Sequence, residues 1–135
     1  MTEDTLREEA VAAQLAGDVA RANDVRQALA ACLEASIVET QLLIAVATAA
    51  FVVPALEATA AGRVAAMALR PIDERGEFAS GLERPLAAAA AHLAVALADR
   101  PAEDRDASGL GEALDLATRV SNRLREKALG GAAPR

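Results

Sequence analysis

The sequence predicts an all-α protein: an antiparallel helical bundle of about four helices, with a long Pro-kinked central helix, in one domain over residues 1–135. Apolar residues recur at spacings of three and four through most of the chain, which is the period of one helix face. No segment alternates apolar and polar residues as a half-buried strand does. Alanine dominates a hydrophobic fraction of 53%, and aromatic residues make up only 1%. Because alanine buries little area per residue, such a core depends on close helix packing and on a partner chain.

The first helical segment carries one apolar stripe, formed by Leu15, Val19, Ala22, Val25, Leu29, Cys32 and Ser36. No proline or glycine lies between Gly17 and Pro54, so nothing obvious interrupts a helix there. Ser36 and Glu39 match the capping-box spacing, which would start a new helix after a tight turn. We expect instead one continuous or nearly continuous helix over residues 3–53, which at 1.5 Å per residue would span roughly 75 Å.

The central segment, residues 36–69, holds more bulky apolar side chain than any other part of the chain. Residues 40–56 carry no charge. Pro54 lies inside this segment and is expected to kink or restart the helix, because proline lacks an N–H and clashes with the preceding turn. Arg70 and Pro71 are expected to end it, since the residue before proline is disfavoured in the α region.

The third helix is expected from about Pro85 to Arg100, after a charged loop over residues 71–84. Its interior is apolar all round, and a helix without a polar face is normally buried on every side. We therefore expect a homo-oligomer in which this helix supplies the interface. The candidate interface residues are Leu86, Ala89, Ala90, His92, Leu93 and Leu97.

The fourth helix is expected over residues 109–129, following a charged loop, with Gly130-Gly131 as its stop. One face carries an apolar stripe made of Leu110, Leu114, Ala117, Val120, Leu124 and Ala128. Asp115 and Arg119 have the i,i+4 spacing of an ion pair on the outer side.

Charge and cysteine content narrow the class of protein. The net charge is −6, which argues against nucleic acid as a partner because such proteins show a basic stripe. Residues 1–39 hold eight acidic and three basic side chains, whereas residues 117–135 hold one acidic and five basic. Contact between these two ends, within or between chains, is one interpretation. A single cysteine, Cys32, fits a reducing cytoplasm, and the alanine and arginine content suggests a bacterial genome.

Catalytic and metal-binding patterns are nearly missing, so the sequence does not favour an enzyme, a cofactor or a metal. The one histidine, His92, has only alanine and valine at the neighbouring helical positions, where a catalytic imidazole needs a group that orients it. It is expected to be a packed or interface histidine. Glu39 and Glu57 border or interrupt the apolar stripe, and each could be a buried partner for Arg63 or Arg70; we expect a solvated or paired charge at the bundle edge, not a metal ligand.

Three functions remain open. The first is a non-catalytic helical bundle that acts through self-association and protein–protein interaction, as a scaffold or accessory subunit. The second is a regulator that binds a small apolar ligand between alanine-lined helices beside Pro54. The third is a small membrane-associated protein, although 17 uncharged residues lie at the lower limit for a span and lack the flanking basic and aromatic residues. We expect the first.

Overall fold

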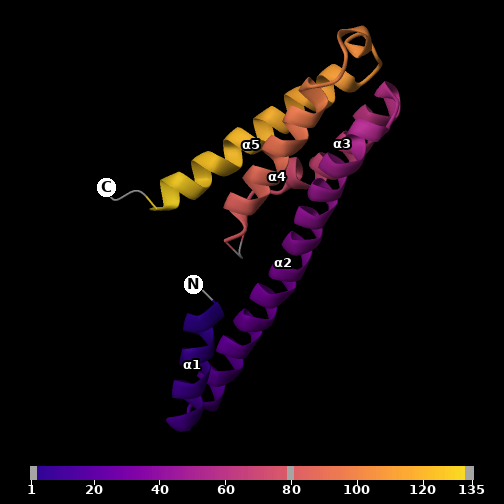
Figure 1. The fold of residues 1–135 in the computed structure, drawn as a ribbon. Helices are drawn as coiled ribbons and strands as arrows, with labels where there is room; N and C mark the ends of the chain where they lie inside the picture. The colour runs from indigo at the N-terminus through magenta and orange to yellow at the C-terminus, as the bar shows by residue number, and fades with distance from the viewer. Residues whose placement is uncertain (1–2, 79–80, 133–135) are drawn as a thin grey trace.

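The computed structural model describes residues 3–78 and 81–132, and within those ranges the protein is helical without any strand (Figure 1). The all-α prediction is therefore confirmed. The described ranges contain five α-helices: α1 Glu3–Leu15, α2 Val19–Val52, α3 Ala58–Glu74, α4 Glu83–Ala98 and α5 Leu110–Ala132. Two short 3-10 helices, η1 Val53–Ala55 and η2 Ala102–Asp104, follow α2 and α4.

The chain breaks between α1 and α2, so the predicted continuous helix over residues 3–53 is wrong. Gly17 has a φ of 75°, a left-handed conformation that glycine adopts at little cost. Asp18 then caps α2, because its carboxylate accepts a hydrogen bond from the Arg21 N–H at 3.1 Å. The alternative break just before Ser36 does not occur either, since α2 runs through that position without interruption.

Of the two outcomes expected at Pro54, a kink or a restart, the structure shows a restart: the long helix ends and a new one begins. After α2 ends at Val52, the chain makes one 3-10 turn that includes Pro54. Glu57 then caps a new helix, because its carboxylate accepts the N–H groups of Ala60 at 2.7 Å and Thr59 at 3.1 Å. With 34 residues, α2 is about 51 Å long.

Two predicted helix ends fall too early. Helix α3 continues past Arg70 and Pro71 for one more turn, so that proline lies inside the helix close to its end. Helix α5 runs through Gly130-Gly131 to Ala132. A proline this near a C-terminus removes a single backbone hydrogen bond, which the remaining contacts of the last turn offset.

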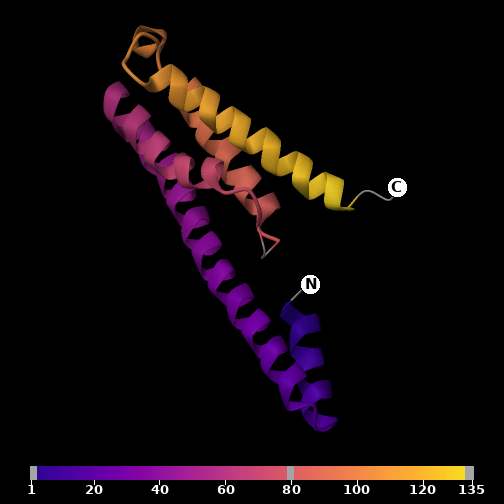
Figure 2. The same cartoon turned by 180° about the vertical axis from the view of Figure 1, so that it is seen from behind.

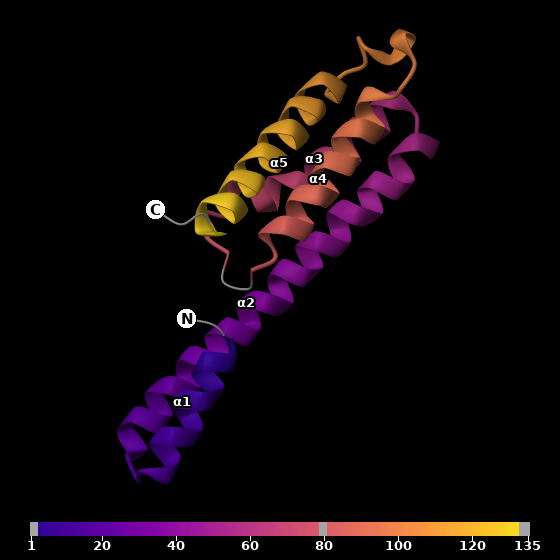
Figure 3. The ribbon, with the colours of Figure 1, turned by 60° about the vertical axis from the view of Figure 1, so that its left-hand side comes forward.

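Consecutive helices run antiparallel, and the C-terminal half of α2 forms a bundle with α3, α4 and α5 (Figures 1 and 3). Helix α4 packs against α2 and α5, and α5 packs against α3 and α4. Helix α1 folds back along the N-terminal half of α2 to make a helical hairpin beyond the end of the bundle. The acidic end of the chain thus packs on α2 and the basic end on α3 and α4.

Small residues bring α3 and α5 close together. A Cβ added to Gly62 on α3 would lie 3.0 Å from the carbonyl carbon of Gly109 and 3.1 Å from the backbone nitrogen of Leu110. Ala61 and Ala65 on α3 and Ala113 and Ala117 on α5 are also buried. The alanine-rich sequence therefore packs through close backbone approach, as its composition predicted.

Candidate interaction surface

The outer face of α2 is the most apolar exposed surface of the described residues. Ile37 is 60% exposed, Ile44 59% and Phe51 85%, and the three are spaced by seven residues. Uncharged residues fill the rest of this face: Val38, Thr40, Gln41, Ala45, Ala47 and Thr48. We call these nine residues the α2 face. None of them carries a charge. Monomeric proteins normally expose apolar residues singly, so an uncharged strip of this length is unusual.

The other helices leave this face uncovered because they all lie on one side of α2. In two opposite views, α1 and the bundle helices occupy the same side of α2, and its far edge has no helix against it (Figures 1 and 2). The covered side contains Val46, Ala49 and Val53, which are fully or almost fully buried. The seven-residue spacing of the exposed side chains keeps them opposite that core over about four turns.

Glu39 is the exception on the covered side of α2, since it is a charged residue with no exposed surface. Its Oε1 atom lies 3.7 Å from Nε of Arg75, just after α3, and Arg75 also lies over the Phe78 ring at 5.8 Å. The ion pair of Glu39 is thus with Arg75. For Glu57, backbone hydrogen bonds lower the pKa of the carboxyl most, and Arg63 lies close enough to contribute to that lowering. The pair holds the segment after α3 against α2, and it leaves the α2 face without charge.

The predicted interface on α4 lies largely inside the chain. Leu86, Ala90, Leu93 and Leu97 are buried against α2 and α5, and Ala89 is half-buried. Of the six candidate residues only His92 is exposed, beside alanines and Val95. A helix that is apolar all round proved easier to cover than expected, because half of its residues are alanines and two helices pack on it.

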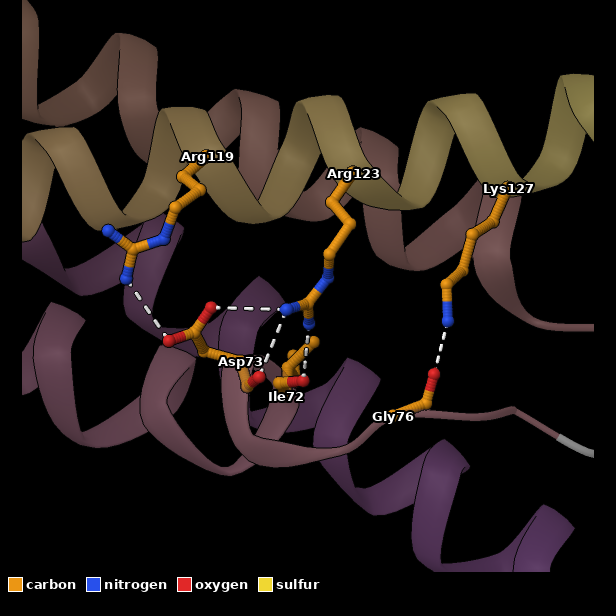
Figure 4. A network of polar contacts seen from close by, with 6 residues as sticks. All are labelled: Ile72, Asp73, Gly76, Arg119, Arg123 and Lys127. Atoms are coloured by element: carbon orange, nitrogen blue, oxygen red, sulfur yellow. Dashed lines mark hydrogen bonds and ion pairs between the residues drawn. The ribbon is translucent and has the colours of Figure 1, made fainter.

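The basic side chains of α5 bind the end of α3 (Figure 4). Arg123 donates to the Ile72 carbonyl at 2.9 Å and to the Asp73 carbonyl at 3.0 Å, and Lys127 donates to the Gly76 carbonyl. Arg119 pairs with the Asp73 carboxylate at 3.1 Å, not with the predicted Asp115 on its own helix. These cations add charged donors to carbonyls at and just after the end of α3, of which Ile72 also accepts the Arg75 N–H at 3.2 Å, so the basic cluster stabilises the fold.

A second arginine closes the end of α2 in the same way. Arg100, whose side chain is 10% exposed, donates to the Val53 carbonyl at 2.8 Å and to the Leu56 carbonyl at 2.7 Å. Asp104 accepts from its Nε at 3.2 Å and fixes the guanidinium in place. Arg100 thereby holds the 3-10 turn that follows α2, where the Val53 carbonyl also accepts the Leu56 N–H at 3.1 Å.

Sites for chemistry are few in the part of the chain that the structure describes. No group of three His, Cys, Asp or Glu side chains there is arranged to hold a metal ion. Cys32 is half-buried on α2 and forms no disulfide. His92 is exposed on α4, with no hydrogen-bond partner identified among the described contacts. These two residues offer no nucleophile–base arrangement.

Two hollows bear on the ligand-binding hypothesis. The one beside Pro54, of about 410 Å³, is lined by Asp99, Arg100 and Asp104, so its walls are charged and not alanine-rich. Another, of about 330 Å³, lies between α4 and α5, and it is lined mainly by alanine together with Leu129 and two arginines, Arg84 and Arg125. The apolar space therefore lies between the last two helices, away from the proline.

One described helical stretch, Val19–Ala55, is long and apolar enough to cross a bilayer by length and composition alone. In its most apolar window 22% of the residues are buried. The core helix of a soluble bundle passes the same test, so this property does not distinguish a protein surface from a lipid surface. The chain matches no known protein family, no curated protein and no solved structure.

Proposed function

We propose that this protein is a non-catalytic helical bundle that works through self-association and protein contact, and that the α2 face is the contact surface. The single observation that carries the proposal is the exposure of Ile37, Ile44 and Phe51 on one uncharged strip of a 34-residue helix. Contiguous exposed apolar strips of this kind on small proteins are typical of interaction sites. A reducing, cytoplasmic setting remains part of the proposal because Cys32 is the only cysteine.

The chemistry of the face favours a protein partner over a bilayer. Three of its nine side chains, Thr40, Gln41 and Thr48, are polar. Thr40 donates to the Ser36 carbonyl of its own helix at 2.7 Å, whereas the Gln41 amide would lose hydrogen bonds in hydrocarbon. A spanning α2 would also have to expose Glu39 and leave its contacts with Arg75 and the core. A protein partner can offer hydrogen-bonding groups to such polar side chains, which hydrocarbon cannot.

The test compares two lysine substitutions at matched positions in the full chain. Ile44 on α2 is 59% exposed and Val95 on α4 is 58% exposed, and both are β-branched residues inside helices. Light scattering over roughly a hundredfold range of micromolar concentrations would follow the molar mass from that of the 13.8 kDa monomer upwards. We expect the mass of the parent chain to rise with concentration, Ile44→Lys to remain monomeric and Val95→Lys to behave as the parent.

Other outcomes reject the proposal in different ways. If the parent chain is monomeric at every concentration tested, the proposed self-association is wrong. If Val95→Lys abolishes association and Ile44→Lys does not, the interface is the outer side of α4, the helix that the sequence suggested, and not the α2 face. A chain that stays in solution only with detergent, or that binds neutral phospholipid vesicles through α2, is a membrane protein.

A second candidate function is favoured by the hollow between α4 and α5. Its alanine and leucine lining with Arg84 and Arg125 fits a small apolar molecule that ends in a carboxylate. Titration with octanoate, followed by NMR shifts of Ala88 and Ala91, should saturate in the parent chain and weaken strongly in Arg125→Glu. Shifts that grow linearly without saturation would exclude this candidate.

A further inference from the structure

The spacing of the α2 face identifies the kind of surface that fits it. Ile37, Gln41, Ile44, Thr48 and Phe51 alternate at steps of four and three residues. This is the 3.5-residue period of a coiled-coil seam, in which side chains of one helix insert between those of a second, nearly aligned helix. All five residues are exposed along α2. A long helix with the same seam is the matching partner, and a second copy of this chain provides one.

We propose that a second copy docks on α2 in antiparallel orientation, with the two-fold axis crossing the exposed face at the level of residue 46, between Ile44 and Thr48. This inference rests on the self-association proposed above and adds the orientation and register of the two helices. A two-fold axis makes the interface use the same residues on both chains, as most homodimers do.

Charge distinguishes the antiparallel from the parallel arrangement. Glu34 is exposed and lies three residues before Ile37 on the same seam. In a parallel dimer, Glu34 would lie opposite the partner's Glu34, and the two acidic α1 helices would lie at the same end. In the antiparallel dimer, Glu34 lies beyond the end of the partner's α2 and the two α1 helices lie at opposite ends, so neither repulsion arises. Like charges that face each other in a seam select against that pairing.

The extent of the uncharged surface sets the register. Exposed positions of the helix carry no charge from residue 35 to residue 56, and the middle of this span lies near Val46. If the dimer is centred there, a residue before position 46 on one chain faces the residue equally far after position 46 on the other chain. The resulting layers of the two helices are Ile44 with the partner's Thr48 and Gln41 with the partner's Phe51, and Ile37 lies at the level of Ala55 in the partner's η1. Each layer combines a bulky side chain with a smaller or more flexible one, which favours interdigitation.

The area of the face indicates how strong this dimer is. Residues 37–52 of α2 span about 24 Å, and half the circumference of a helix about 12 Å in diameter is about 19 Å. Each chain therefore buries about 450 Å², or roughly 900 Å² for the pair, which is below the standard size of stable complexes. We expect a reversible dimer that forms as the concentration rises. When the copies separate, the polar side chains of the α2 face can be hydrated.

Cysteine cross-linking tests the orientation in the full chain, in a Cys32→Ala background that leaves no other thiol. A short bis-maleimide would be added at a concentration where light scattering finds the dimer. Ile44→Cys should cross-link in either orientation, because this residue lies close to the proposed axis. Ile37→Cys should not cross-link with itself, since the two copies would be about 27 Å apart along the antiparallel helices. A mixture of Gln41→Cys and Phe51→Cys chains, one of them tagged, should give the mixed product.

The outcomes separate this inference from the proposed function. Self-linking of Ile37→Cys without the mixed Gln41–Phe51 product would mean that α2 pairs in parallel, which overturns the orientation and keeps self-association. Failure of Ile44→Cys to cross-link in a sample shown to be dimeric would place the contact elsewhere and reject both. The mixed product together with unlinked Ile37→Cys is the expected result.

Discussion

Gly62 is where the structure makes its sharpest stability prediction, because α3 and α5 approach each other through its missing side chain. Alanine at this position would place a Cβ at 3.0–3.1 Å from three backbone atoms of Gly109 and Leu110. Backbone atoms at the start of a helix cannot move aside as a flexible side chain does. Overpacking of this kind costs about 1–3 kcal/mol, against a gain of up to about 1 kcal/mol from replacing glycine by alanine inside a helix.

We therefore expect Gly62→Ala to lose roughly 0.5–2 kcal/mol of unfolding free energy, or about 2–7 °C in Tm for a chain of this length. The matched control is Gly111→Ala in α5, where an added Cβ meets no atom within 4 Å. That variant should be as stable as the parent or gain up to about 1 kcal/mol. Urea unfolding followed by circular dichroism measures both. If Gly62→Ala is stabilised as much as Gly111→Ala, the two helices do not pack as closely as described.

Two further predictions concern the helix ends. Arg100→Ala should lower the unfolding free energy by about 2–4 kcal/mol, because the Val53 and Leu56 carbonyls lose a charged donor. Arg100→Lys should recover only part of this loss. Equal stability of the parent and both variants in urea unfolding would contradict the capping role. The backbone N–H groups of Ala60 and then Thr59 hold the pKa of Glu57 below its ordinary value of 4.5. Since the folded pKa is the lower one, Glu57 stabilises the fold above about pH 4.5 and this contribution disappears as the pH falls through the folded pKa. The stability difference between the parent chain and Glu57→Ala should therefore shrink on acidification, and an NMR titration midpoint at or above 4.5 would refute the assignment.

The amphipathic elements were predictable from the sequence, and α5 is the clearest case. Its stripe of Leu110, Ala117, Val120 and Leu124 is buried as the spacing indicated. The sequence pattern did not predict the break at Gly17, because a single glycine is tolerated inside many helices, and here the Asp18 cap directly after it makes the turn. A glycine followed at once by a capping residue is a stronger signal than either residue alone.

The surface was harder to predict than the fold. Counting apolar residues drew attention to α4, whereas the exposed strip lies on α2, because alanine contributes to the count and little to the area. The seven-residue recurrence of Ile37, Ile44 and Phe51 was visible in the sequence and would have located the face. The contacts of Arg100 and Arg123 were beyond sequence reasoning, since each arginine reaches carbonyls 44 to 51 positions away along the chain.

Helix lengths explain why one side of α2 stays uncovered within a single chain. Helix α2 is about 51 Å long, whereas the 17 residues of α3 and the 16 of α4 reach only about 24–26 Å. The chain uses these shorter helices and α5 to build a bundle on one side of the C-terminal half, and α1 covers the same side of the N-terminal half. No described helix remains to cover the opposite side. If a second α2 with the same length and the same seam covers this side, that contact is the physical reason for its uncharged composition.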